Sequence, residues 1–197
     1  MTIPDRSILV SYWVVPGQFL AGEYAGGRDE EKTRQRLTAF LSAGFDTFFD
    51  LTAEGELPPY LPVLMEETGH YGSAFGYHYD RRVHYGSPTG YHYHRFPIPD
   101  KGLPSSQTMI AILEAIDAAT AQGCKVYLHC WGGIGRTGTT VACYLVHHGL
   151  DGKAALGRLN ELYQTSEQFT FFPHAPETEE QAAFVLNWAD ETMGDGQ

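Results

Sequence analysis

The sequence contains no long apolar run and shows no sign of export. No stretch reaches the roughly eighteen consecutive apolar residues that a transmembrane helix requires. The segment from Met1 to Val10 lacks a basic start followed by an apolar core, so we expect no secretory signal peptide. Together with an ordinary globular composition, 43% apolar and 19% charged, these absences predict a cytoplasmic protein with no membrane partner.

Positive charge is also scarce. The chain has 13 lysine and arginine residues against 24 aspartate and glutamate residues, which gives a formal net charge of −11. Nucleic acids and anionic membranes attract proteins of the opposite sign at long range, so we expect neither as a partner. A phosphorylated ligand would therefore have to be captured by positive charge at one local site.

Cysteine is the third scarce residue, with three in 197 residues. Cys124, Cys130 and Cys143 form an odd and sparse set, which is typical of a reducing compartment where a free thiol persists. We interpret Cys124 and Cys143 as core residues of a strand and the following helix, with a reversible disulfide to Cys130 as the alternative. The length suits one α/β domain over residues 1–197.

One glycine-rich segment, residues 129–138, carries the clearest chemistry. The apolar run Val126–Leu128 indicates a buried strand before it, and Thr139–His148 after it has helical character. The segment is therefore predicted to be a strand-to-helix turn whose backbone N–H groups converge on one anion. A helix N-terminus favours a phosphate dianion and also a thiolate, which points to Cys130 as a nucleophile.

The side chains of this loop fit the same chemistry. Three of the five residues between Cys130 and Arg136 are glycines, which let the backbone curl around an anion. Arg136 offers a planar fork for two phosphate oxygens, and the Thr137 hydroxyl can donate to the sulfur. His129 should point away from the phosphate and serve as a hydrogen-bonding residue behind the loop. The residues expected to bind phosphate are Trp131, Gly132, Gly133, Ile134, Gly135 and Arg136.

The pattern His-Cys-(five residues)-Arg-Thr resembles the signature of the cysteine-dependent protein tyrosine phosphatases, in a form typical of their dual-specificity branch. The segment from Gly44 to Thr52 also resembles the second strand of that family and its exit. The resemblance implies a fold with a central, mostly parallel sheet flanked by helices on both faces, and catalysis without a metal or another cofactor. The alternative is a glycine-rich loop holding a buried, inert cysteine.

A proline-punctuated loop, residues 95–104, lies upstream of the signature and carries Asp100. Cleavage of a phosphate ester needs an acid to protonate the leaving oxygen. The loop resembles the general-acid loop of dual-specificity phosphatases, which assigns that role to Asp100. The alternative is that Asp100 only begins a turn, since Pro-Asp-x-Gly is an ordinary turn pattern.

The segment from Pro176 to Val185 resembles the one in which tyrosine phosphatases place a water-positioning glutamine, which would be Gln181. Thr178 and Gln181 also have the spacing of a capping box, in which each side chain bonds the backbone of the other residue. The two interpretations are compatible.

Strands and helices alternate along the rest of the chain, which predicts a parallel or mixed sheet covered on both faces. The patterns indicate the following elements: strands at 8–15, 18–21 and 45–51, and helices at 29–42, 60–68, 105–123, 151–163 and 178–191.

A tyrosine- and histidine-rich segment, residues 70–94, departs from the family pattern and is predicted to be a hairpin insertion. Two similar copies, 76–81 and 90–95, suggest two strands around a turn at 86–88, beside the mouth of the site. An aromatic, polar sheet face and a substrate-docking surface are two interpretations of the segment. A metal site is a third, because four histidines of the segment could converge on one ion: His78, His84, His92 and His94.

These features predict a phosphomonoester hydrolase that forms a phosphocysteine intermediate and acts on phosphorylated proteins at tyrosine and at serine or threonine. Phosphoinositide phosphatases of the superfamily that the chain resembles tend to carry lysines in the signature loop, so their absence here implies phosphoproteins over polyphosphorylated inositides. A small phosphomonoester or a phosphoinositide is the alternative substrate. A pseudophosphatase module that binds phosphate without turnover and a sulfur-transfer or arsenate-reducing enzyme are alternatives of other classes.

Overall fold

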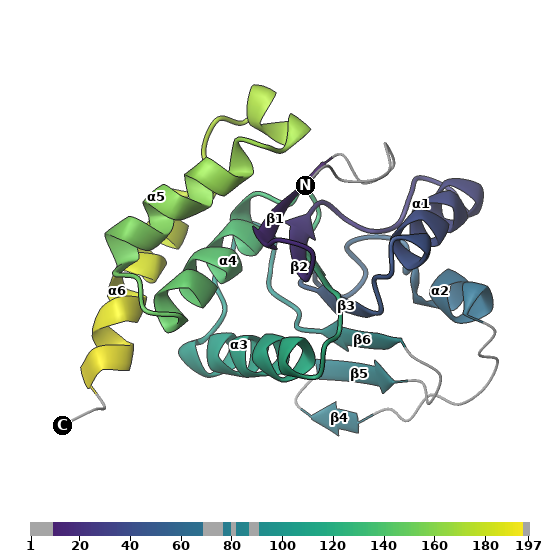
Figure 1. Cartoon of the computed structure of the whole chain (residues 1–197), viewed down its shortest axis with the longest axis horizontal. Helices are drawn as coiled ribbons and strands as arrows, with labels where there is room; N and C mark the ends of the chain where they lie inside the picture. Colours follow the sequence, from purple (N-terminus) through teal and green to yellow (C-terminus); the bar gives the residue numbers. More distant parts are fainter. Residues whose placement is uncertain (1–9, 69–76, 80–81, 87–90, 195–197) are drawn as a thin grey trace.

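The computed structural model describes residues 10–68, 77–79, 82–86 and 91–194 (Figure 1). Its strands form one seven-stranded sheet in the order β1-β2-β7-β3-β6-β5-β4. Their bounds are β1 Ser11–Val15, β2 Phe19–Gly22, β3 Thr47–Asp50, β4 Tyr77–Tyr79, β5 Arg82–Gly86, β6 His92–Arg95 and β7 Val126–His129. The four central strands, β2, β7, β3 and β6, are parallel, and the outer pairs are antiparallel.

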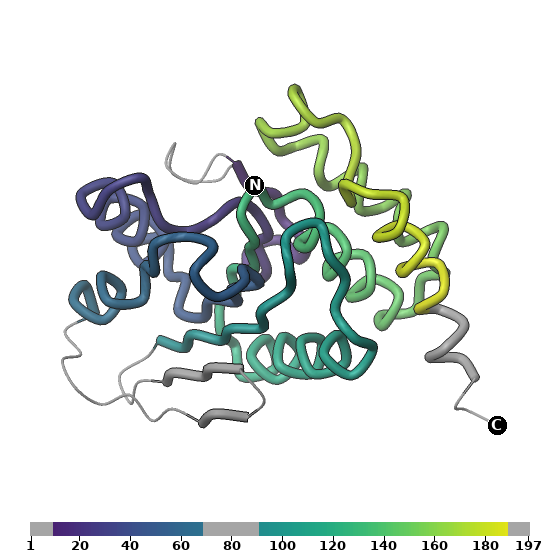
Figure 2. The backbone as a smooth tube through the Cα atoms, turned by 180° about the vertical axis from the view of Figure 1, so that it is seen from behind, coloured from purple at the N-terminus to yellow at the C-terminus, as the bar shows by residue number. Residues whose placement is uncertain are grey.

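Helices cover both faces of the sheet, as Figures 1 and 2 show from opposite sides. Along each central strand, alternate side chains enter separate clusters: Phe48 and Tyr127 on one face, Phe49 and Leu128 on the other. The first face is covered by α1 (Glu30–Ser42) and α2 (Leu61–Glu67). The second is covered by α3 (Ser106–Ala121), α4 (Gly135–His147), α5 (Gly152–Tyr163) and α6 (Glu179–Gly194). The predicted fold class is confirmed.

The sheet brings the carboxyl ends of its parallel strands to one edge. β3, β6 and β7 end there at Asp50, Arg95 and His129. In open α/β sheets ligands bind at this edge, because the loops and helix N-termini that follow the strands converge on it. Among the described helices, none combines the length and apolarity that crossing a membrane requires.

The tyrosine- and histidine-rich segment differs from the predicted two-stranded hairpin. Its two similar copies contribute β4 and β6, and a third strand, β5, lies between them and pairs with both. The alternating pattern of each copy indicated a strand, but it carried no information on the strand that separates them. The loop 87–90 and the side chains of His78 and His84 lie outside the described residues.

Candidate active site

The signature loop connects the end of β7 to the first turn of α4. Cys130 follows β7 directly and is 3% exposed, while Arg136 and Thr137 lie in the first turn of the helix. Gly133 has a φ of +73°, and a Cβ on it would lie 2.4 Å from the backbone carbon of Gly22. Only glycine fits this position, so the loop can curl against the end of β2.

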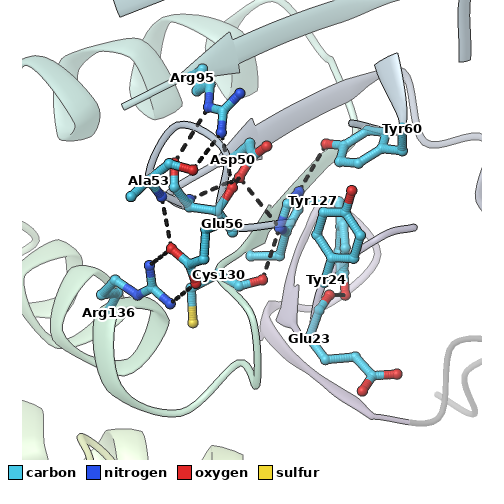
Figure 3. A network of polar contacts seen from close by, with 12 residues as sticks. Glu23, Tyr24, Asp50, Ala53, Glu56, Tyr60, Arg95, Tyr127, Cys130 and Arg136 are labelled. Atoms are coloured by element: carbon cyan, nitrogen blue, oxygen red, sulfur yellow. Dashed lines mark hydrogen bonds and ion pairs between the residues drawn. The ribbon is translucent and has the colours of Figure 1, made fainter. Parts of the chain in front are cut away.

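The Arg136 guanidinium faces the Glu56 carboxylate, as Figure 3 shows. Its two terminal nitrogens each donate to one oxygen of the Glu56 carboxylate, at 2.7 Å. Nη1 also donates to the Ile98 carbonyl at 3.0 Å, and Nη2 to Asp100 Oδ1 at 2.9 Å. Among the described residues, these acceptors take all four terminal N–H groups and leave the Nε–H.

Glu56 reaches Arg136 from the loop that follows β3. The Ala53 N–H donates to Glu56 Oε2 at 2.8 Å, and the Arg95 guanidinium holds the same loop by donating to the Ala53 carbonyl at 2.7 Å. Burial raises the pKa of the Glu56 carboxyl, but the hydrogen bonds from Arg136 and Ala53 outweigh it and hold that pKa below its ordinary value. Glu56 is therefore ionised at neutral pH and paired with Arg136.

Asp100 lies on a turn at the rim of the site. The Gly102 N–H donates to the Pro99 carbonyl at 2.8 Å, and Lys101 has a φ of +57° between them. The turn interpretation therefore holds, and the same turn places the half-exposed Asp100 carboxylate on Arg136. The loop leading to the turn is hydrogen-bonded along the exit of β3, where the Ile98 N–H donates to the Leu51 carbonyl at 3.1 Å.

His129 lies behind the loop, as expected, in a fully buried network. Burial lowers the pKa of His129, and Asp50 opposes this only in part, so the imidazole is neutral. Its Nδ1 lies 3.1 Å from the Cys130 carbonyl, and its Nε2 lies 2.8 Å from the Tyr60 hydroxyl. A carbonyl only accepts, so Nδ1 carries the proton and Nε2 accepts from Tyr60. The hydrogen bond from His129 Nδ1 therefore fixes the backbone carbonyl of Cys130.

The hydrogen bond predicted from Thr137 to the Cys130 sulfur is not formed in the structure. Thr137 Oγ1 is buried and has no hydrogen-bond partner among the described residues. The next two hydroxyls, of Thr139 and Thr140, instead donate to carbonyls four residues back. Which acceptor a threonine hydroxyl reaches depends on the χ1 rotamer of that threonine, and the sequence motif does not determine the rotamer.

Gln181 is fully buried and connects three segments of the site. The Gln181 N–H donates to Thr178 Oγ1, and Gln181 Oε1 accepts from the Thr178 N–H, both at 3.2 Å, which confirms the capping box. Its Nε2 donates to the Gly102 carbonyl at 3.3 Å, in the turn that carries Asp100. A Cβ on Gly135 would lie within 3.0 Å of the Gln181 amide, so this side chain also packs against the signature loop. Its water-positioning role stays a prediction.

The other cysteines have the environment expected of core residues. All three cysteines are free thiols in the structure. Cys143 is buried in α4, where burial raises the pKa of its thiol well above the ordinary range, and Cys124 is partly buried against the same cluster. Neither forms the alternative disulfide to Cys130.

The family model of the DSP-PTPase phosphatase domain of Swiss Army Knife proteins matches residues 78–185, more than half of the chain. The chain belongs to this family of dual-specificity phosphatase domains. The match includes Asp100, Cys130 and Arg136 and also Gln181.

Individual proteins are also similar to this phosphatase domain. Cyclin-dependent kinase inhibitor 3 of Sus scrofa is 30% identical over 122 residues, which is 61% of this chain and 49% of that protein. Protein tyrosine phosphatase domain-containing protein 1 of Mus musculus is 31% identical over 122 residues, which is 56% of this chain and 13% of that protein. The chain thus spans about half the length of the first of these relatives and a smaller share of the second.

Solved structures share the fold. Tk-PTP in its active form superposes with a TM-score of 0.65 at 22% identity, covering 92% of this chain and 97% of that one. PTPMT1 in complex with PI(5)P gives a TM-score of 0.64 at 14% identity, covering 95% and 99%. At these identities the likeness establishes the fold of the phosphatase domain and not its substrate.

Sequence reasoning missed Glu56 and Tyr60. Both lie after β3, which is parallel to β7 and adjacent to it, so their loop must reach the edge that holds the signature. A polar residue soon after a central parallel strand was the available signal for Glu56. Tyr60 only appeared as the start of a short helix, and its contact with His129 depends on how α2 packs.

Proposed function

We propose that this domain hydrolyses phosphomonoesters through a phosphocysteine intermediate. The observation that carries the proposal is the convergence of Cys130, Arg136 and Asp100 from two loops, with Asp100 2.9 Å from the guanidinium of the helix that begins after Cys130. A nucleophile at a helix N-terminus, an oxyanion-binding fork and an acid are the parts that phosphoryl transfer requires. An inert cysteine would not need the other two.

The first step transfers the phosphoryl group to sulfur. The Cys130 thiolate attacks phosphorus and forms the S–P bond, while the bond from phosphorus to the ester oxygen breaks. Asp100 gives its proton to that departing oxygen, and Arg136 with the loop amides holds the equatorial oxygens. In the second step water attacks phosphorus and Asp100 takes its proton. The S–P bond then breaks, its electron pair returns to sulfur, and phosphate leaves.

Ligand binding requires a change in the contacts of Arg136. Both terminal nitrogens already donate to Glu56, and their remaining hydrogens go to Ile98 and Asp100. Asp100 is half exposed, whereas the Glu56 side chain is 13% exposed and held by Ala53. We therefore expect phosphate to displace Asp100 and not Glu56. The freed carboxyl group then lies at the rim, where the leaving oxygen departs.

Phosphorylated proteins are the proposed substrates. The signature loop offers one formal charge, Arg136, and the apolar Trp131 and Ile134, which suits a single phosphate on an amino-acid side chain. A phosphoinositide is the second candidate, since one structural neighbour is PTPMT1 in complex with PI(5)P. Phosphate release from matched phosphotyrosine, phosphothreonine, phosphoinositide and nucleotide substrates tests the proposal. Turnover of lipid or nucleotide alone would contradict the phosphoprotein assignment.

Replacing Asp100 by asparagine should slow hydrolysis in proportion to how poor the leaving group is. For an alkyl phosphate or an unactivated phenyl phosphate we expect a loss of about 10²–10⁴-fold in kcat, because a departing alkoxide needs a proton. For an activated, acidic phenol the loss should be much smaller. The measurement is kcat across a series of aryl phosphates, for the wild type and the variant.

The matched control is Lys101→Gln, on the same turn and also exposed. It should leave the slope of log kcat against leaving-group pKa unchanged. Equal losses across the series in the Asp100 variant would restrict Asp100 to its role in the turn.

Glu56→Gln should destabilise the fold at neutral pH. The substitution removes a charge from a pair in which the Arg136 side chain is 2% exposed, so we expect a loss of about 1–3 kcal/mol in the free energy of unfolding. Because the folded pKa of Glu56 is lowered, its stabilisation is present above the ordinary carboxyl pKa and is lost as the pH falls through the folded value. Urea unfolding at pH 7 and in acid measures both effects.

Glu54→Gln is the control for this prediction, because Glu54 is exposed on the same loop and has no hydrogen bond or ion pair among the described residues. It should be nearly neutral at both pH values. If the two variants were equally stable at pH 7, the ion pair would contribute nothing net.

A further inference from the structure

A cavity of about 880 Å³ opens beside the signature loop. Its wall begins at Trp131, the residue after Cys130, which is 56% exposed. The exit of β2, the start of α1 and the loop after β3 supply most of the rest of the wall, which includes Tyr24, Arg28, Lys32, Leu57 and Pro58. A group bound in this cavity would therefore lie next to a phosphate held by the loop.

The cavity gathers positive charge in an acidic chain. Three of the 13 basic residues line it: Arg28, Lys32 and Arg36. Arg36 is neutralised by Glu23 at 2.8 Å. Lys32 lies 4.0 Å from Asp29, with both side chains more than half exposed, which is a weak pair. Arg28 is exposed and has no ion pair or hydrogen bond within the described part of the chain. Arg28 and Lys32 thus remain available to an anion.

The wall nearest the signature loop is apolar and held in place. Trp131, Leu57 and Pro58 contribute to it, and the Tyr24 ring lies among them. The Tyr24 N–H donates to the Trp131 carbonyl at 2.8 Å, and its hydroxyl donates to the Pro58 carbonyl. A preformed surface with an exposed aromatic ring, one unpaired cation and one weakly paired cation suits an extended peptide that carries apolar and acidic side chains.

One carboxylate shows which kind of anion fits. Glu167, from the short helix η2 (Glu167–Thr170), also lines the cavity. A compact polyanion such as an inositol polyphosphate would meet this negative charge as well as the two cations. A peptide can present one acidic side chain to Arg28 and Lys32 and keep neutral groups near Glu167 and Trp131. The charges therefore favour a peptide over a polyphosphorylated small molecule.

We propose that this cavity is a subsite for the residues that flank the phosphorylated residue, and that Arg28 and Lys32 select an acidic side chain there. The inference rests on the proposed function, because it assumes a phosphopeptide at the signature loop. It deepens that function by naming the substrate class: proteins phosphorylated beside an acidic residue.

The test compares two peptides that carry a difluorophosphonate mimic of phosphotyrosine and differ only by glutamate against glutamine at the flanking positions. Binding is measured by fluorescence anisotropy at low salt. The wild type should bind the glutamate peptide about fivefold more tightly than the glutamine peptide, which is the effect expected of two exposed charge contacts. At high salt, screening should bring the ratio of the two affinities close to one. A preference that does not respond to salt would overturn the proposal.

Charge-reversal variants assign the preference to residues. Arg28→Glu/Lys32→Glu should reduce the glutamate-to-glutamine ratio to one or below, and Glu167→Gln should raise it. Lys153→Glu, an exposed lysine on α5, is the matched control and should leave the ratio unchanged. If the control lowered the ratio as much as the double variant, the effect would be one of net charge and the subsite would be refuted. If inositol polyphosphates bound and the peptides did not, the proposed occupant would be wrong.

This measurement separates the subsite from the proposed function, because binding of the phosphonate needs no turnover. Absence of hydrolysis with any substrate would refute the phosphatase proposal alone. The peptide ratios and their dependence on Arg28 and Lys32 would still decide the subsite. Should the double variant fail to fold, Arg28→Gln/Lys32→Gln and the salt series on the wild type give the same decision.

Discussion

Cys130→Ser should abolish hydrolysis of an aryl phosphate, with a loss on the order of 10⁴–10⁶-fold in kcat. A serine hydroxyl is not ionised at neutral pH. No described side chain is hydrogen-bonded to the Cys130 sulfur, and His129 is committed to the Cys130 carbonyl and to Tyr60, so no base is in place to take the serine proton. The fold should be unchanged, because the substitution replaces one small side chain by another of similar shape. Affinity for a phosphonate ligand should therefore persist.

Cys124→Ser is the control, because this partly buried thiol lies before β7 and outside the loop. It should keep full activity. Both the wild type and the control should also keep activity in a chelator, since the proposed steps use only the thiolate, Arg136 and Asp100. Turnover retained by Cys130→Ser would refute the thiolate mechanism, and turnover lost in the chelator would indicate a metal.

The signature loop could be predicted from sequence because its chemistry is local. Cys130, the glycines and Arg136 lie within seven consecutive residues, and the strand before and the helix after determine their geometry. Apolar patterns also gave most of the helices and strands. The helices bury one face each, and the central strands are buried on both faces, so they appear in the sequence as short apolar runs. Asp100 could be predicted from a short motif, because the proline and glycine residues beside it favour the turn on which it lies.

The partners of these residues could not be predicted in the same way. Glu56 is 80 residues from Arg136 in the sequence, and Tyr60 is 69 from His129. Such pairs depend on strand order and on the packing of α2, which composition and periodicity do not specify. The missing contact of Thr137 has a smaller cause, a single rotamer. The motif predicted Arg136, His129 and Thr137, but the residues around each of them in the folded structure determine which contacts they make.

Arg136→Lys should reduce kcat/KM by about 10²–10³-fold although it keeps the positive charge. The guanidinium satisfies two Glu56 oxygens, the Ile98 carbonyl and Asp100 at the same time, and its planar fork matches two phosphate oxygens. A lysine ammonium has three N–H groups on one nitrogen, so it cannot hold Glu56 with two bonds and also bind phosphate in the same plane. The measurements are kcat/KM and the inhibition constant of vanadate.

The vanadate readout distinguishes two roles of Arg136. If the guanidinium binds the transferred phosphoryl group, vanadate affinity should fall together with kcat/KM, because vanadate adopts the same trigonal arrangement of oxygens. If Arg136 only anchors Glu56 and the turn that carries Asp100, stability should fall while vanadate affinity stays near that of the wild type. Arg158→Lys, an exposed arginine on α5 paired with Glu161 at 2.8 Å, should change neither quantity. An Arg136→Lys variant within tenfold of the wild type in both readouts would show that charge alone suffices at this position.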